Sequence, residues 1–153
     1  MTATPGELAG IRRHAEAEYP SECCGVILAR GDGDRILMRC RNIQDALHRS
    51  NPVEHPRDSR TAYYIDPKDL LAVGRREAEG YEVTVIYHSH SEAGAYFSET
   101  DKRNALFGGE PAYPHATYVV VSVVGGRVTA GTAFGWSPEL REFMPVAFPE
   151  FAA

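Results

Sequence analysis

The chain has 153 residues, of which 43% are hydrophobic and 24% charged, and its formal net charge at pH 7 is -5. This composition predicts one soluble domain over residues 1–153, and the negative charge without any basic run argues against nucleic acid as a partner. No apolar run reaches the roughly 18 residues that a spanning helix needs, and no signal-peptide core opens the chain, so we expect no membrane partner and a cytoplasmic location. The cysteines Cys23, Cys24 and Cys40 form a poor disulfide framework and are expected to be buried small hydrophobes in a reducing compartment.

The first third of the chain predicts a helix and then a hairpin. Apolar residues at helical spacing precede Pro20, which predicts a helix over about residues 5–18. The segment CGVILARG is a short apolar strand that ends at the turn signal GDGD, and RILMRCRNI returns from it as a second strand.

The middle of the chain predicts a long loop followed by a well-marked helix. The polar stretch from Gln44 to Thr61 holds two prolines and two histidines and is expected to be irregular. Asp66 as N-cap, Pro67 at the first helical position and Gly80 at the far end delimit the helix that follows.

The second half of the chain predicts three strands and one short helix. The segment EVTVIYH alternates as a strand, and ATYVVVSVVGGRVTAGTAFGW predicts two strands that join at Gly125 and Gly126. Between them, Glu99 to Phe107 reads as a helix, while the segment from Trp136 onward gives no usable signal.

The segment YHSHSEAGAYFSETD carries the strongest chemical signal. His88 and His90 are two apart on a predicted strand, so their side chains point to the same side. Ser98 precedes the short helix and Asp101 follows three residues later, which places the two side by side on its first turn. Two imidazoles and one carboxylate are a ligand set for a catalytic zinc, which keeps a fourth position for water.

Each half of this segment also has an ordinary structural interpretation. A serine followed three residues later by an acid is a capping motif that opens many helices without any metal. Paired histidines on a strand can be surface residues. The combination at fixed spacing, directly after an apolar strand, is much more specific than either half.

A zinc hydrolase also needs a base outside the metal ligands, and Glu22 is a candidate for it. Glu22 lies just before an apolar strand, at a predicted sheet end. Its alternative interpretation is a solvated residue in a turn between helix and strand.

With Glu22 included, the chain resembles the JAMM metalloproteases, also called MPN-plus domains. That family's pattern is a glutamate near the N-terminal strand, often as Glu-x-Cys-Gly, then His-Ser/Thr-His, seven residues and Ser-x-x-Asp. This sequence has Glu22 before Cys23, Cys24 and Gly25, and then His88, His90, Ser98 and Asp101 in register. The resemblance extends from about Pro20 to Gly135. It departs from small relatives at Ser91 and Phe97, where they often have proline, which concerns the fit of the substrate more than the chemistry.

The resemblance implies roles for the five polar residues. His88, His90 and Asp101 would hold Zn²⁺, Glu22 would be the general acid and base, and Ser98 would hydrogen-bond the developing oxyanion. The implied fold is α/β, a single-domain MPN fold with a curved mixed sheet and helices on both faces, similar to the cytidine deaminases.

The implied activity is zinc-dependent hydrolysis of an amide or isopeptide bond. Small prokaryotic members of the family act on ubiquitin-like sulfur-carrier proteins that end in Gly-Gly, so the expected partner is such a protein. Tyr96 and Phe97 are expected either to wall the cleavage point or to pack under the helix that follows.

Competing interpretations remain open at this point. One is a catalytically silent MPN scaffold that only binds partners. Another is a different zinc hydrolase with His-x-His, either a barrel amidohydrolase, for which the chain is too short, or a β-lactamase-like enzyme, whose pattern has Asp-His soon after the pair where this chain has SEAG. A deaminase is disfavoured because the chain has no Cys-x-x-Cys pair. The remaining histidines, His14, His48, His55 and His115, are expected on the surface, with His48 and His55 within reach of a substrate.

Overall fold

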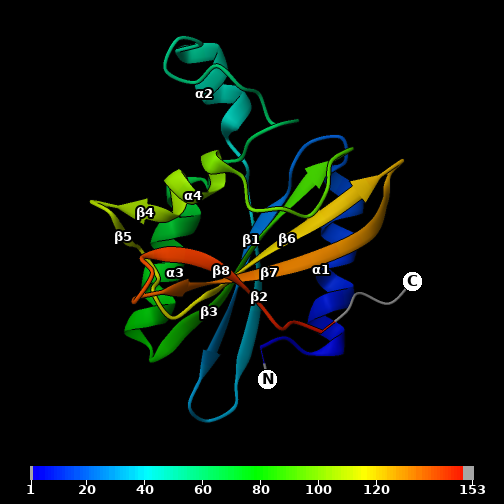
Figure 1. Ribbon diagram of the computed structural model, residues 1–153. Helices are drawn as coiled ribbons and strands as arrows, with labels where there is room; N and C mark the ends of the chain where they lie inside the picture. Colours follow the sequence, from blue (N-terminus) through cyan, green and yellow to red (C-terminus); the bar gives the residue numbers. More distant parts are fainter. Residues whose placement is uncertain (1, 150–153) are drawn as a thin grey trace.

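A six-stranded sheet forms the centre of the structure, a computed structural model that describes residues 2–149 (Figure 1). The strand order is β2-β1-β3-β6-β7-β8, with β3 and β6 parallel and every other neighbouring pair antiparallel. The strands are β1 Cys24–Arg30, β2 Arg35–Cys40, β3 Tyr81–Ser91, β6 Thr117–Val124, β7 Arg127–Ser137 and β8 Glu142–Val146. A two-residue pair, β4 Leu106–Phe107 and β5 Glu110–Pro111, lies apart from it.

Helices cover both faces of this sheet, which confirms the predicted α/β fold (Figure 1). Helix α1 (Pro5–Glu18) packs on one face, α3 (Pro67–Ala78) and α4 (Glu99–Ala105) lie on the other, and α2 (Gln44–Ser50) sits beyond one end of the sheet. Within residues 2–149 no helix is both long and apolar enough to cross a membrane.

Local sequence signals explain where the two longer helices begin. Thr4 and Glu7 form a reciprocal capping box at α1, with Pro5 at its first position. The Asp66 side chain accepts a hydrogen bond from the backbone N–H of Lys68 at the start of α3. Both predicted helices are confirmed, as are the first hairpin and the turn at Gly125 and Gly126, where both glycines have positive φ.

Two apolar cores lie on opposite sides of the sheet because side chains alternate along each strand. Along β6, Val119 and Val121 pack toward α1, whereas Val120 packs toward α3. The three cysteines are buried and unpaired, as predicted.

One irregularity in β3 decides which residues face which core. The pairing of β1 with β3 shifts between Ile27 and Leu28, so that Val85 and Val83 take consecutive partners and Thr84 is an extra residue. Val83 and Val85 therefore belong to different cores although they are two apart. This bulge puts the even-numbered residues that follow in β3 on the α3 side.

The structure corrects two predicted elements and supplies one that the sequence did not indicate. The stretch Gln44–Thr61 is not irregular throughout, since its first seven residues form α2. The short helix ends at Ala105, because Leu106–Phe107 pairs with Glu110–Pro111. The segment after Trp136 supplies β8, the edge strand, whose Phe143 is buried against Trp136.

Helix α2 was not predictable from periodicity because polar contacts hold it. The Asp45 carboxylate accepts hydrogen bonds from the backbone N–H and the hydroxyl of Ser59, and Gln44 Nε2 donates to the Arg57 carbonyl. Such bonds to a later segment leave no apolar stripe in the sequence.

His14 is buried, which corrects its predicted surface position. Its Nδ1 lies 2.7 Å from the Tyr87 hydroxyl, and burial lowers the pKa of His14 to about 4. The imidazole is therefore neutral at pH 7. It shares one hydrogen bond with the Tyr87 hydroxyl, and the tautomer of the ring decides which of the two groups donates. This bond fixes the Tyr87 ring, which lies directly over Gly25.

Replacing Gly25 by alanine should destabilise the protein by about 2–3 kcal/mol, because a Cβ there would overlap the Tyr87 phenol ring. Denaturant unfolding measures the change. The matched control is Gly74→Ala in α3, where a Cβ meets nothing and a gain of about 0.5–1 kcal/mol is expected. Equal stability of Gly25→Ala and the parent would contradict the close approach.

Candidate metal centre

Three separate segments bring the candidate residues together. His88 and His90 lie at the end of β3, on the face that carries Val120. Asp101 belongs to the first turn of α4, and Glu22 precedes β1. Because β1 runs antiparallel to β3, its beginning lies beside the end of β3, and Cys24 pairs with His88.

The candidate ligand atoms converge on one point. His88 Nε2 and His90 Nε2 are 3.2 Å apart, and each lies 3.1 Å from Asp101 Oδ2. A tetrahedral zinc with bonds of about 2.0–2.1 Å holds its ligand atoms about 3.3–3.4 Å apart. These three side chains are all buried, and their spacing fits such an ion.

The tautomer of His90 leaves its Nε2 atom free of a proton, as a metal ligand must be. His90 Nδ1 lies 2.9 Å from the Gly94 carbonyl oxygen, which can only accept a hydrogen bond, so Nδ1 carries the proton. In the neutral ring Nε2 then presents a lone pair toward the Asp101 carboxylate. A positive ion between the two atoms would remove that repulsion.

The charges of His88 and Asp101 also suit the binding of a metal ion. Burial lowers the pKa of His88, so its imidazole is neutral at pH 7. Burial would raise the pKa of Asp101, but its contact with the His88 imidazole and the hydrogen bond from the Ser98 backbone N–H hold that pKa well below its usual range. The site therefore offers a neutral His88 imidazole and an ionised Asp101 carboxylate, the forms in which these groups bind metals.

Glu22 lies beside the imidazole pair but is not bonded to it. Ligand atoms of Glu22, His88 and His90 all lie within 4.8 Å of one another, yet Glu22 Oε1 is buried without a hydrogen-bond partner within the described residues. Burial, followed by the charge of Asp101, raises the pKa of Glu22 to about 9, and Arg57 acts in the opposite direction. An orphaned buried carboxyl oxygen indicates a missing partner at this place.

Ser98 and Asp101 form the capping box that the alternative interpretation predicted. Ser98 Oγ accepts a hydrogen bond from the Asp101 backbone N–H, and Asp101 Oδ2 accepts one from the Ser98 backbone N–H, both at 3.0 Å. The same Oδ2 atom contacts both imidazoles. Capping and convergence on the histidines therefore occur together, and neither interpretation excludes the other.

Aromatic side chains lie beside the two imidazoles, and one of them, Tyr63, was not singled out by the sequence. Tyr63, buried, stacks on His88 with ring centroids 4.4 Å apart. Tyr96 is 55% exposed and meets the His90 ring edge-on, so it remains a candidate wall. Phe97 is buried and packs among Tyr118, Phe134 and Phe143, with its ring centroid 6.5 Å from that of His88, so it belongs to the apolar core rather than to an exposed wall.

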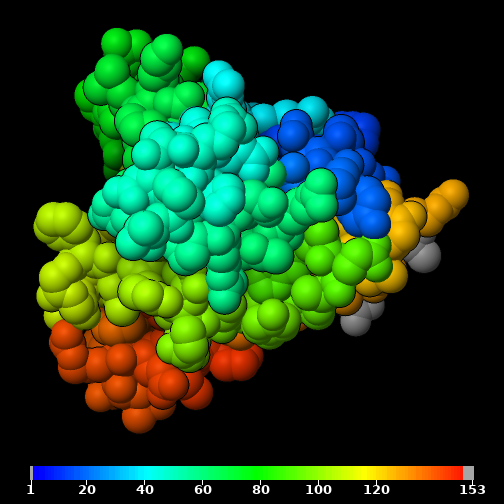
Figure 2. All heavy atoms as spheres, turned by 90° about the horizontal axis from the view of Figure 1, so that it is seen from above, coloured from blue at the N-terminus to red at the C-terminus, as the bar shows by residue number. Residues whose placement is uncertain are grey.

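The segment that contains α2 covers the end of the sheet where these residues lie, as the view from above shows (Figure 2). His48 and His55 are half-buried in this segment, where His48 Nδ1 contacts the His55 carbonyl at 2.7 Å, and His115 is exposed as predicted.

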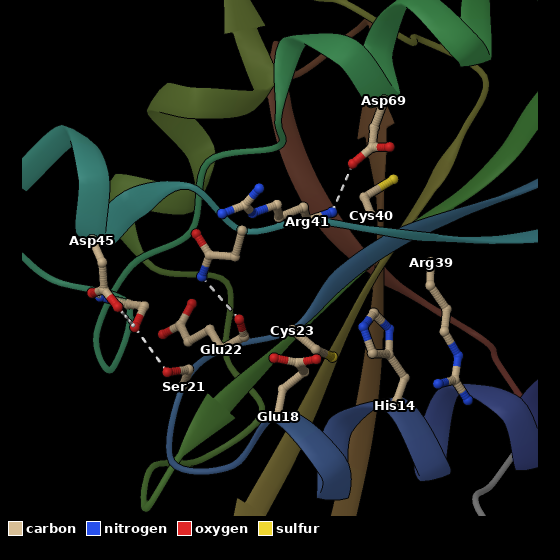
Figure 3. A pocket seen from close by; sticks show the side chains of 12 residues that line it. His14, Glu18, Ser21, Glu22, Cys23, Arg39, Cys40, Arg41, Asp45 and Asp69 are labelled. Atoms are coloured by element: carbon tan, nitrogen blue, oxygen red, sulfur yellow. Dashed lines mark hydrogen bonds between the residues drawn. The ribbon is translucent and has the colours of Figure 1, made fainter.

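A cavity of about 560 Å³, lined mostly by polar and charged side chains, reaches Glu22. Figure 3 shows the Glu22 carboxylate at its wall on the side of Ser21 and Asp45.

The comparison with known proteins identifies one protein family that matches this chain. Residues 6–136 match the family described as prokaryotic homologs of the JAB domain. Tail tip assembly protein K of Escherichia phage N15 is 37% identical over 93 residues, which cover 60% of this chain and 31% of that protein. CysO-cysteine peptidase of Mycobacterium tuberculosis (strain H37Rv) is 34% identical over 110 residues, which cover 71% of this chain and 64% of the peptidase. The chain therefore spans less than two thirds of the length of either relative.

Two solved structures share the fold. A protein from Salinibacter ruber has a TM-score of 0.61 at 31% identity, over 96% of this chain and 89% of that one. A protein from Desulfitobacterium hafniense has a TM-score of 0.64 at 21% identity, over 94% and 87%, which supports the fold alone.

Between pH 7 and 8.5, the metal-free protein should lose stability as pH rises. Folded Glu22 keeps its proton up to about pH 9, whereas the unfolded carboxyl ionises near 4.5, so the folded state binds one more proton in this window. The free energy of unfolding should fall by up to about 1.4 kcal/mol per pH unit. Chemical denaturation after chelator treatment measures the slope.

Glu22→Gln should remove most of this slope and raise the stability at pH 8. Glu82→Gln, at an exposed position of β3, is the matched control and should keep it. The same slope in Glu22→Gln and the parent would show that folded Glu22 is already ionised.

Proposed function

This chain belongs to the prokaryotic homologs of the JAB domain, and we propose that it is a zinc-dependent hydrolase of amide or isopeptide bonds. The substrate we propose is the carboxy-terminal Gly-Gly tail of a ubiquitin-like sulfur-carrier protein. The observation that carries the proposal is the convergence of two imidazole nitrogens and a carboxylate oxygen within 3.1–3.2 Å, beside an orphaned glutamate oxygen.

His88, His90 and Asp101 would hold the metal, because they are the three groups already in mutual contact. Zinc bound there would act as a Lewis acid on the scissile carbonyl and lower the pKa of water toward about 7. The hydrogen bond of His90 to Gly94 and the stacking of Tyr63 on His88 orient the two rings before any ligand arrives.

Glu22 would move the proton of the reaction. The pKa of this carboxyl would be lowered from its metal-free value by a zinc ion held beside Glu22, so the ionised form would be available to take a proton from the attacking water, whose oxygen forms the new bond to the scissile carbon. The same carboxyl then gives that proton to the nitrogen as the carbon–nitrogen bond breaks, so the products are a carboxylic acid and an amine. Burial favours the protonated carboxyl, which suits the second step.

Ser98 would donate a hydrogen bond to the oxyanion that develops on the scissile carbonyl. Ser98 Oγ already accepts from the Asp101 backbone N–H, which fixes its position at the start of α4. Its hydroxyl hydrogen is left to donate. The helix cap therefore orients the half-buried Ser98 side chain and uses its oxygen only as an acceptor.

The name of the mycobacterial relative supports the substrate class, since CysO-cysteine peptidase names a cysteine adduct. The surroundings of the site support small residues at the cleavage point. Tyr63 stacks on one imidazole and Tyr96 contacts the other, so bulky side chains next to the metal would meet aromatic rings. The alternative, a scaffold that only binds partners, gains no specific support from a chain that keeps all five polar groups.

Metal-loaded protein should contain about one zinc per chain, because three suitable ligands converge at one place. Elemental analysis after removal of unbound metal measures it. His88→Ala should lose most of the zinc, whereas His115→Ala, at an exposed position, should keep it. Equal zinc in parent and His88→Ala would exclude this site.

The enzyme should cleave a carrier protein joined through Gly-Gly to cysteine, and it should cleave the matching Leu-Leu fusion much more slowly. Glu22→Gln should keep zinc and fold but lose about 100- to 10,000-fold in kcat, because the amide cannot take the water's proton. Mass spectrometry of the released carrier gives the rates.

Zinc content and circular dichroism of Glu22→Gln are the controls for this experiment. Turnover at the parent rate would refute the role of Glu22. A parent protein that binds zinc and the fusion but cleaves nothing would favour the scaffold.

A further inference from the structure

We propose that Asn42 is a positioning residue of the candidate metal centre. Its side-chain amide would fix the proposed proton carrier Glu22 and also Tyr63, the ring that stacks on His88. This inference rests on the proposed function, and it adds a residue that acts through other groups. Asn42 follows β2 and lies outside the motif residues that the sequence singled out.

The side chain of Asn42 makes hydrogen bonds to three separate segments. Its Nδ2 donates to the carbonyl of Glu22 at 2.9 Å and to the carbonyl of Ala62 at 3.2 Å. Its Oδ1 accepts from the backbone N–H of Gln44 at 3.0 Å and from that of Tyr64 at 3.1 Å. A carboxamide has two N–H groups and an oxygen with two lone pairs, so every hydrogen-bonding position of this side chain is used.

The partners of Asn42 also fix the orientation of its amide group. Both contacts of Nδ2 are carbonyl oxygens, which can only accept hydrogen bonds, and both contacts of Oδ1 are backbone N–H groups, which can only donate them. The reverse orientation of the amide would lose all of these bonds. A polar network in which every group is satisfied is rigid, so Asn42 holds its partners at fixed places.

Glu22 depends on main-chain hydrogen bonds for its position. It lies before Cys24, the first residue of β1 that the sheet pairs. The Glu22 N–H donates to the Ser59 carbonyl at 2.7 Å, and the Glu22 carbonyl accepts the bond from Asn42. One oxygen of the Glu22 carboxyl is buried without a partner within the described residues. The place of this carboxyl beside the imidazole pair therefore depends on the backbone that Asn42 and Ser59 hold.

Tyr63 is held by the same amide, from both sides. Asn42 bonds the carbonyl of Ala62 and the N–H of Tyr64, which are the residues directly before and after Tyr63. The buried Tyr63 ring stacks on His88 with the ring centroids 4.4 Å apart. Groups that orient a metal-binding histidine affect how tightly the metal is held. Asn42 therefore connects the proposed proton carrier to the ring that orients His88.

Loss of the Asn42 amide should displace these groups without unfolding the chain. Asn42 lines the cavity of about 560 Å³ together with Glu22 and Ser59. Water can enter this cavity and replace the lost hydrogen bonds, so the freed carbonyl groups would not stay unsatisfied. A reacting group that is misplaced by about 1 Å can cost about 100-fold in rate, and a lost contact that orients a metal ligand costs about 10- to 100-fold in metal affinity or activity.

The test removes the two hydrogen bonds that Asn42 donates. Asn42→Asp keeps an oxygen for the N–H groups of Gln44 and Tyr64, so the link to α2 remains. The ionised aspartate cannot donate to Glu22 or Ala62. In saturating zinc, kcat for the carrier joined through Gly-Gly to cysteine should fall by about 10- to 100-fold while KM stays within about twofold. Asn42→Ala, which adds no charge, should lose as much.

A double variant separates positioning from a general loss of structure. Because Asn42 acts through the Glu22 carboxyl, Asn42→Asp should lower kcat by no more than about twofold in the Glu22→Gln background. Asn51→Asp is the matched control, since the Asn51 side chain is bonded to Glu54 in its own exposed turn, and it should leave kcat and zinc affinity unchanged. A loss in the double variant as large as in the parent background would overturn the proposal.

Zinc affinity is a second readout that needs no turnover. Competition with a chelator should show an affinity about 10- to 100-fold lower in Asn42→Ala, because Tyr63 no longer holds the His88 ring in place, while circular dichroism shows the parent fold. Zinc affinity equal to that of the parent would also overturn the proposal. If the parent protein binds zinc but cleaves no fusion, the proposed function fails, and the zinc affinity of Asn42→Ala still decides the role of Asn42.

Discussion

The carboxylate of Asp101 is the point on which both the local fold and the candidate site depend. One oxygen, Oδ2, accepts a hydrogen bond from the Ser98 backbone at the start of α4 and lies 3.1 Å from both imidazoles of β3. The helix is only seven residues long, so its cap is a large part of what fixes it. A metal held here would therefore also stabilise the start of α4 against β3.

Around this point the structure concentrates buried polar groups that an apolar core would avoid. Glu22 is buried with an orphaned oxygen and a raised pKa, and the two histidines are buried beside it. Such a cluster costs stability unless a ligand satisfies it. The aromatic cluster of Phe97, Tyr118, Phe134 and Phe143 lies directly behind it and supplies apolar burial on the same face.

The segment that contains α2 and the strands that carry the histidines are held by different kinds of contact. Strands and apolar packing hold the histidines, whereas hydrogen bonds among Gln44, Asp45, Arg57 and Ser59 hold α2 and the segment after it. Polar contacts of this kind exchange with water more easily than a packed core does. The two histidines are thus fixed by the sheet, whereas the segment that contains α2 is anchored separately by polar contacts.

The sequence by itself determined the spacing of His88, His90, Ser98 and Asp101, the place of Glu22 and the longer helices, because caps, turns and alternation are local signals. It could not show α2, the burial of His14 or the stacking of Tyr63 on His88, since each depends on contacts between segments distant in the chain. It also left open whether Phe97 or Tyr96 faces the substrate. Only the tertiary structure decided which face of the sheet carries the histidines, because the extra residue Thr84 in β3 reverses the alternation before His88. A shift of one residue turns every following side chain to the other face, and pairing with β1 rather than local sequence sets that shift.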